Sequence, residues 1–125
     1  MHEGPQRISP VGSSQSGGDE PLQAGMIISN EPGYYKTGEY GMRIENLVLV
    51  VPAEAESGFA PEKQLLGFET LTFAPIARDL IETGLLSADE RRWVDDYHAR
   101  VLGIVGPQLE GEAGAWLEEA CAPLD

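Results

Sequence analysis

Basic residues are scarce in this sequence, and their scarcity excludes two kinds of partner. Among 125 residues, eight Lys and Arg stand against 21 Asp and Glu, which gives a formal net charge of −13. Nucleic acids and anionic lipid surfaces are both bound through basic faces. We therefore expect neither nucleic acid nor a membrane as a partner.

Cysteine, histidine and long apolar runs are scarce as well. Cys121 is the one cysteine, so no intrachain disulfide is possible, and its acidic neighbours disfavour a reactive thiolate. His2 and His98 are too few for a zinc finger. No apolar run approaches the ~20 residues that span a bilayer, and no signal peptide is visible. These shortages lead us to expect a cytoplasmic protein.

What is present has the size and composition of one globular domain. The chain is 42% hydrophobic and 23% charged, as in ordinary folded proteins. The negative charge is unevenly spread, because residues 1–53 carry three basic and six acidic side chains, whereas residues 54–125 carry five and fifteen. This difference suggests two parts with different roles.

The first half of the chain predicts antiparallel strands. Met26–Glu31 has strand character, and the following Pro32-Gly33 pair is typical of a tight turn. We expect a connecting loop over 34–40, then a long strand at Gly41–Val51 that is rich in β-branched residues. A third strand is predicted at residues 64–73.

Three charged residues lie on these strands and form the candidate site. Side chains alternate along a strand, so Arg43 and Glu45 share a face, and two neighbouring strands could bring Glu31 to the same place. Clustered carboxylates supply half of a site for an ion such as Mn²⁺, and Arg43 could orient them. The spacing alone leaves another interpretation open, an Arg–Glu ion pair with Glu31 solvated at a turn.

The second half predicts helices. A short helix at Ile76–Thr83 is expected to end at Gly84, and Ser87 with Glu90 fits a capping box. A last helix is expected at Leu109–Ala120. The helix that follows the box is indicated by apolar residues at helical spacing: Val94, Tyr97, Val101 and Val105.

Three ordered motifs resemble the Xaa-Pro aminopeptidases of the pita-bread metallopeptidase family. They are HEGPQRIS at 2–9, GMIISNEPGYY at 25–35 and GMRIEN at 41–46. The tail from LTFAPI at 71–76 onward is similar to the extra C-terminal segment of the longer forms. The resemblance implies an α+β fold, namely the C-terminal part of a pita-bread fold, with antiparallel strands followed by an acidic helical tail. It places the end of the catalytic domain in 1–70 and the extension in 71–125.

The resemblance also implies a role for each candidate residue. Glu31 matches a glutamate that binds one of two divalent ions, usually manganese, and that can shuttle a proton. Glu45 matches the glutamate that bridges both ions, and Arg43 matches an arginine beside the metal carboxylates. His2 matches a histidine that contacts the substrate near the scissile bond. The implied reaction is metal-assisted hydrolysis of the bond before a proline in second position.

The family's site needs two aspartates and another histidine, and all three precede the HEGP motif. Asp19, Asp95 and Asp96 are not placed to replace them, and His98 is expected to be a packing or surface histidine. With two of five metal ligands, we expect a truncated portion that is inactive alone and homodimeric in its full-length form. Prolidase-like or creatinase-like chemistry is a weaker alternative. A non-catalytic peptide- or protein-interaction remnant of the fold is the alternative from another class.

Overall fold

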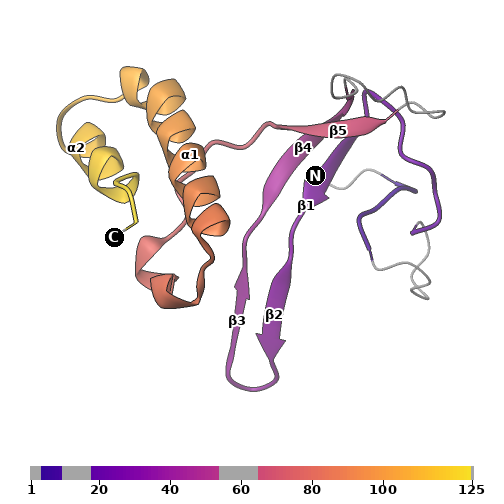
Figure 1. Cartoon of the computed structure of the whole chain (residues 1–125), viewed down its shortest axis with the longest axis horizontal. Coiled ribbons are helices and arrows are strands. Elements are labelled where there is room, and N and C mark those ends of the chain that lie inside the picture. The colour runs from indigo at the N-terminus through magenta and orange to yellow at the C-terminus, as the bar shows by residue number, and fades with distance from the viewer. Residues whose placement is uncertain (1–3, 10–17, 54–64, 125) are drawn as a thin grey trace. The chain divides into compact units, whose positions relative to one another are not determined.

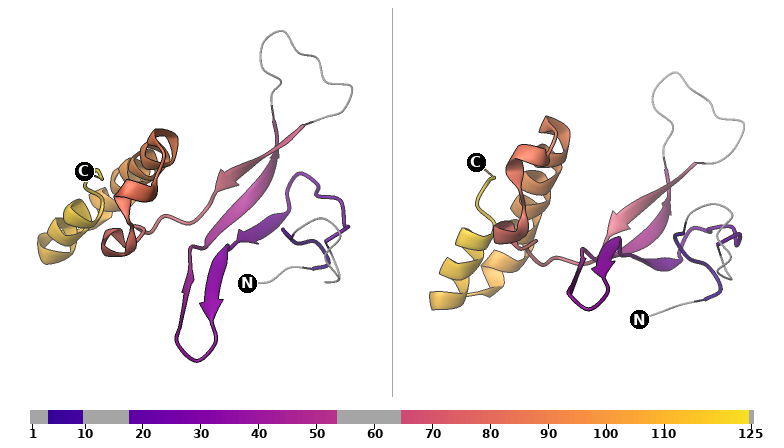
Figure 2. Two further views of the ribbon diagram at one scale, coloured as in Figure 1. Left: turned by 60° about the horizontal axis from the view of Figure 1, so that its bottom comes forward. Right: turned by 90° about the horizontal axis from the view of Figure 1, so that it is seen from below.

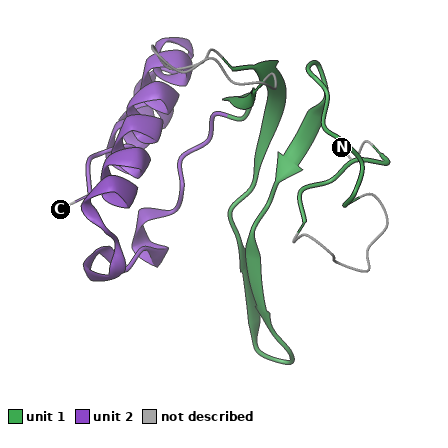
Figure 3. Ribbon diagram, turned by 45° about the vertical axis from the view of Figure 1, so that its right-hand side comes forward, with its two compact units in different colours: residues 1–72 green, residues 73–125 purple. Residues whose placement is uncertain are grey.

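The computed structural model describes residues 4–9, 18–53 and 65–124, and the chain divides into two compact units. Unit 1 comprises residues 1–72 and contains the strands of the described part (Figure 3). Unit 2 comprises residues 73–125 and is helical. Each unit has a buried apolar cluster of its own.

A three-stranded antiparallel sheet forms the body of unit 1. Its strands are β1 (Ile27–Asn30), β4 (Asn46–Pro52) and β5 (Leu66–Thr70), in the order β1-β4-β5 (Figure 1). The strands predicted at Met26–Glu31 and at 64–73 are confirmed, and each is somewhat shorter than expected. β4 is the central strand and pairs with both of the others.

One face of this sheet carries the core of unit 1. Ile28 pairs with Val48, so the two side chains point to the same face, and Val50 follows two residues later on that face. All three are buried, and the partly buried Leu22 and Met26 pack against them. The core therefore depends on the alternation of apolar residues along β1 and β4.

A two-stranded hairpin prolongs the ribbon formed by β1 and β4 (Figure 1, Figure 2). It consists of β2 (Gly33–Lys36) paired antiparallel with β3 (Tyr40–Arg43). The prediction of a connecting loop over 34–40 is wrong, because only residues 37–39 form the turn. Gly38 has a φ of 74°, a conformation that glycine adopts without steric cost and that closes the turn here.

The ribbon is interrupted where residues 31–32 face residues 44–45. The tight turn predicted at Pro32-Gly33 and the unbroken strand predicted at Gly41–Val51 are therefore both wrong. Proline has no N–H to donate to a ladder, so regular pairing stops at this point. The Pro32 carbonyl still accepts from the Ile44 N–H at 3.2 Å, which keeps the two strands together across the break.

Unit 2 contains the two predicted long helices, α1 (Ala88–Val105) and α2 (Gly111–Ala120). The helix predicted at Ile76–Thr83 is wrong, since that region forms two separate 3-10 turns, at Arg78–Leu80 and Thr83–Leu85. Backbone N–H groups just before the first turn donate to side chains of α1, and these bonds hold the chain extended. In the described part of the chain, no helix combines the length and apolar character needed to cross a membrane.

The core of unit 2 lies between α1 and the end of α2. Tyr97, Val101, Leu117 and Cys121 form its buried cluster. His98 has no exposed surface. Of the two positions expected for it, packed or at the surface, the structure has the packed one. Burial raises the pKa of the Cys121 thiol. A raised pKa disfavours the reactive thiolate, so burial is the reason for the low reactivity that we expect of this residue.

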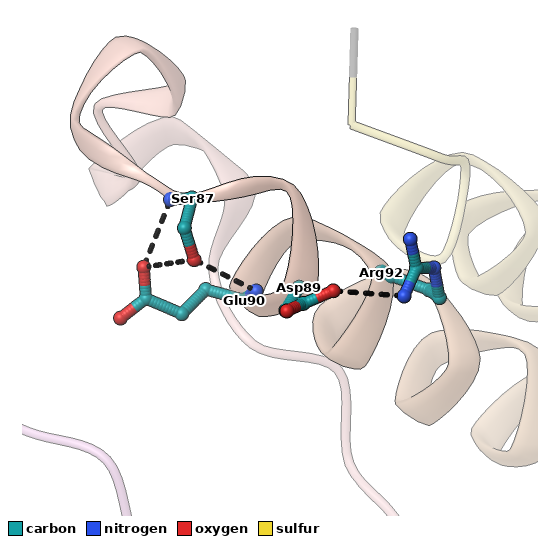
Figure 4. Close-up of polar contacts among 4 residues, drawn as sticks. All are labelled: Ser87, Asp89, Glu90 and Arg92. Carbon is teal, nitrogen blue, oxygen red and sulfur yellow. Dashed lines mark hydrogen bonds and ion pairs between the residues drawn. The ribbon is translucent and has the colours of Figure 1, made fainter.

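The start of α1 is fixed by the predicted capping box (Figure 4). The Ser87 hydroxyl accepts from the Glu90 N–H at 3.2 Å, and the Glu90 carboxylate accepts from the Ser87 N–H at 2.9 Å. The same carboxylate accepts from the Ser87 hydroxyl at 2.8 Å. These hydrogen bonds lower the pKa of the Glu90 carboxyl below its ordinary value.

Removal of the cap is expected to weaken unit 2 measurably. Ser87→Ala leaves N–H groups of the first turn unpaired, and loss of an N-cap costs about 1 kcal/mol. Denaturant unfolding followed by circular dichroism measures the loss. Arg92→Gln serves as the control, because the Arg92–Asp89 ion pair is largely exposed and should change stability by less than about 0.5 kcal/mol. Equal losses in the two variants would contradict the role assigned to the cap.

Candidate metal-binding carboxylates

Two carboxylates face each other at the break in the hairpin ribbon. Glu31 directly follows Asn30, and Glu45 directly precedes Asn46, the residue with which Asn30 pairs. Arg43 ends β3 on the other side of the break. The expectation that two antiparallel strands bring Glu31 and Glu45 to one place thus agrees with the strand register of the structure.

Arg43 contacts both carboxylates. Its Nε lies 3.1 Å from Glu45 Oε2, and its Nη1 lies 3.4 Å from Glu31 Oε2. The planar guanidinium presents several donors in a fixed geometry, so one arginine can hold two anions on the same side of the chain. Of the two interpretations that the sequence left open, the ion pair is present, but Glu31 takes part in it and is not merely solvated at a turn.

The cluster remains accessible to solvent. The side chains of Glu31, Glu45 and Arg43 are 32%, 37% and 49% exposed. Ion pairs this exposed add little to stability, because water screens them and the side chains lose freedom. The main consequence of the arrangement is therefore positional, since oxygen atoms of two carboxylates stay close together at a surface that a ligand can reach.

The two carboxylates are the right type of ligand for divalent ions, but they are too few to form a complete metal site. Carboxylate oxygens are preferred ligands of hard divalent cations. Within residues 4–9, 18–53 and 65–124, however, the structure holds no group of three or more His, Cys, Asp or Glu side chains that could bind a metal. His2, the remaining candidate, lies outside the described residues. Glu31 and Glu45 can therefore supply only part of a metal site.

Tyr35 and two glycines form the surface next to the cluster, and the sequence analysis missed them. Gly33 pairs with Arg43, so Tyr35, two residues further along β2, lies on the same face of the hairpin. A Cβ added at Gly41 would lie 2.7 Å from Tyr35 Cδ1, and one added at Gly33 would lie 2.9 Å from Tyr35 Cε2. Both glycines make room for the ring. The matching Gly-x-Tyr and Gly-x-Arg spacing is the signal for this surface, but the expected loop over 34–40 obscures it.

Two family models match the chain. Metallopeptidase family M24 matches residues 1–52, and the C-terminal region of peptidase M24 matches residues 64–124. The first match contains the cluster of Glu31, Arg43 and Glu45. The second contains β5 and the described helices of unit 2.

Individual relatives agree with these models. The chain is 43% identical over 126 residues to a probable Xaa-Pro aminopeptidase P of Laccaria bicolor, covering 99% of this chain and 19% of the relative. It is 46% identical over 125 residues to aminopeptidase P2 of Arabidopsis thaliana, covering 99% of this chain and 17% of the relative. The chain thus spans about a fifth of the length of the curated relatives it matches.

A solved structure gives the fold. The X-prolyl aminopeptidase of Caenorhabditis elegans, described as a cytosolic enzyme with a di-nuclear active site, matches with a TM-score of 0.75 and 36% identity. The match covers 98% of this chain and 19% of that chain. The resemblance predicted from the three motifs is confirmed. The chain belongs to metallopeptidase family M24, in which it forms the C-terminal part of a pita-bread fold of the Xaa-Pro aminopeptidase type, with antiparallel strands followed by an acidic helical tail.

Proposed function

We propose that this chain is the C-terminal part of an enzyme that hydrolyses the bond between an N-terminal residue and a following proline. The observation that supports this function is the cluster in which Arg43 contacts both Glu31 and Glu45. Residues 1–70 would belong to the catalytic domain and residues 71–125 to a C-terminal extension. The substrates would be peptides with proline in second position.

Glu31 and Glu45 would supply part of the ligands for two divalent ions, for which we propose Mn²⁺. When bound, such ions lower the pKa of water and polarise the substrate carbonyl. Arg43 keeps the two carboxylates on one side of the hairpin, as its two contacts indicate. Glu31 would accept the proton released by the attacking water, and His2 would donate to the substrate oxygen.

The 125-residue chain by itself would be inactive. Two carboxylates leave most coordination positions of two metal ions unfilled, so further donors from the rest of a longer protein are needed. The length of the relatives is consistent with such a longer protein. In that form we propose a homodimer. We place it in the cytoplasm, a location that the description of the Caenorhabditis elegans enzyme as cytosolic supports.

A segment exchange tests this function. The matching segment of the Caenorhabditis elegans enzyme is replaced by this chain, which aligns with it over 98% of its length. We expect metal-dependent release of the N-terminal residue from an Xaa-Pro peptide, abolished by a chelator. The 125-residue chain alone, assayed in Mn²⁺, is expected to release nothing.

Two results would contradict the proposal in different ways. A chimera that folds and remains inactive would favour the alternative, a non-catalytic peptide- or protein-interaction remnant. Hydrolysis by the isolated chain would instead refute the proposed dependence on donors from outside it.

A further inference from the structure

The first residues of unit 2, 73–78, are held by side chains of helix α1, and we call this segment the strap. Tyr97 Oη donates to the Ala74 carbonyl at 2.9 Å and accepts from the Ala74 N–H at 3.4 Å. Two residues further on, the Ile76 N–H donates to His98 Nε2 at 3.0 Å. Alternate residues of the strap therefore bond to adjacent residues of α1.

The strap also reaches the last turn of α2 and the residues that follow it. Arg78 donates from Nη1 to the Glu119 carbonyl at 3.2 Å and from Nη2 to the Pro123 carbonyl at 2.9 Å. From the side of α1, Asp95 Oδ1 accepts from the Leu124 N–H at 2.8 Å. The strap therefore contacts both α1 and the end of unit 2.

His98 can make its bond to the strap only as a neutral ring. Because the Ile76 N–H donates to Nε2, that nitrogen carries no proton, and the proton of the neutral imidazole sits on Nδ1. Nδ1 is buried and has no hydrogen-bond partner among the described residues. If the ring took up a second proton, that proton would sit on Nε2. Nε2 would then be a donor and could no longer accept from the Ile76 N–H, so the bond to the strap would be lost.

The charged groups around His98 act in opposite directions. Burial, and then the positive charge of Arg78, lower the pKa of His98, whereas Asp95 raises it. Tyr97 and Cys121 are the other titratable side chains in the adjoining core. Burial raises the pKa of the Cys121 thiol above its ordinary value, so we assign proton uptake near pH 6 to His98.

We propose that His98 is a proton-sensitive latch, which releases the strap from α1 in mildly acidic solution while both helices stay folded. The closed strap requires unprotonated His98, and the released strap lets the ring take up a proton. The released state therefore binds more protons, and closure weakens as the pH falls below the ordinary histidine value of about 6.5. The strap directly follows unit 1, so its release lengthens the connection between the units.

Amide hydrogen exchange of the 125-residue chain, followed by NMR at pH 7.5 and pH 5.5, tests the latch. After correction for intrinsic rates, protection of the Ile76 amide is expected to fall by up to about tenfold, because only the pH unit below the ordinary histidine value of about 6.5 contributes and one proton changes the open-to-closed ratio by at most tenfold per pH unit. Val101, in the middle of α1, is expected to keep its protection.

Two variants make the test specific. His98→Gln can accept the same bond through its side-chain carbonyl and does not titrate, so the response to pH should disappear. His2→Gln is the matched control, because His2 is the other histidine of the chain, and this variant should keep the response.

Three results would overturn the proposal. They are unchanged Ile76 protection at pH 5.5, simultaneous loss at Ile76 and Val101, and a response that disappears in the His2→Gln variant. If the His98→Gln variant does not fold, the titration of the His98 ring in the unmodified chain decides. A ring that takes up its proton while the Ile76 amide keeps its protection would refute the latch.

Discussion

Glu45→Gln in the segment-exchange enzyme is expected to lower kcat/KM for an Xaa-Pro peptide by at least about 100-fold. The substitution removes an anionic oxygen that we propose to bind metal, and changes to groups that merely support metal ligands already cost ~10–100-fold. Glu31→Gln should have an effect of the same order. Metal content, measured by inductively coupled plasma mass spectrometry, is expected to fall with activity in both variants.

Glu39→Gln provides the matched control on the same hairpin. Glu39 lies in the turn between β2 and β3, is 53% exposed, and pairs with Lys36 at 2.7 Å. The chemical change is the same as at Glu45, but activity and metal content should be preserved. Retention of both by Glu45→Gln, or their loss in Glu39→Gln, would show that the carboxylates at the break are not metal ligands.

Leu117→Ala is expected to have the largest effect on stability. Leu117 is 2% exposed and belongs to the cluster that joins α1 to α2. Truncation of a buried leucine costs about 2–5 kcal/mol, a large share of the 5–15 kcal/mol that holds a typical domain together. Trp93 and Trp116 are the two tryptophans of the chain, and both lie in unit 2, so fluorescence during denaturant unfolding reports on this unit.

The same truncation at an exposed leucine is the control. Leu85 is 84% exposed in the 3-10 turn before α1. Leu85→Ala removes the same atoms without opening a cavity, so its unfolding midpoint should stay close to that of the unmodified chain. Equal shifts for the two variants would mean that Leu117 does not stabilise unit 2 through burial.

Features that depend on neighbouring residues could be predicted from the sequence. The capping box needs Ser87 and Glu90 three positions apart, and α1 needs apolar residues at a helical period, so each signal lies within a short window. The pairing that faces Glu31 with Glu45 was also expected, because both lie in segments with strand character.

Features that depend on distant partners were missed. The Pro-Gly pair at 32–33 is typical of a turn, but Gly33 instead begins β2, because β2 pairs with β3. The predicted helix at Ile76–Thr83 fails because the strap bonds to side chains 22 and 23 positions away. Arg43 was expected to orient the carboxylates, but its direct contact with Glu31, just beyond β1, depends on the pairing of strands that are distant in sequence.

The strap bears on how unit 2 completes its fold during synthesis. Helices form from local contacts as the chain emerges from the ribosome, but the acceptors of Arg78 lie 41 and 45 positions downstream. The hydrogen bond of Asp95 likewise needs the Leu124 N–H, which lies 29 positions later in the chain. The Arg78 contacts can form only after residues 119 and 123 have left the exit tunnel, and the Asp95 contact only after residue 124. Until then, the first and last residues of unit 2 are not joined by these hydrogen bonds.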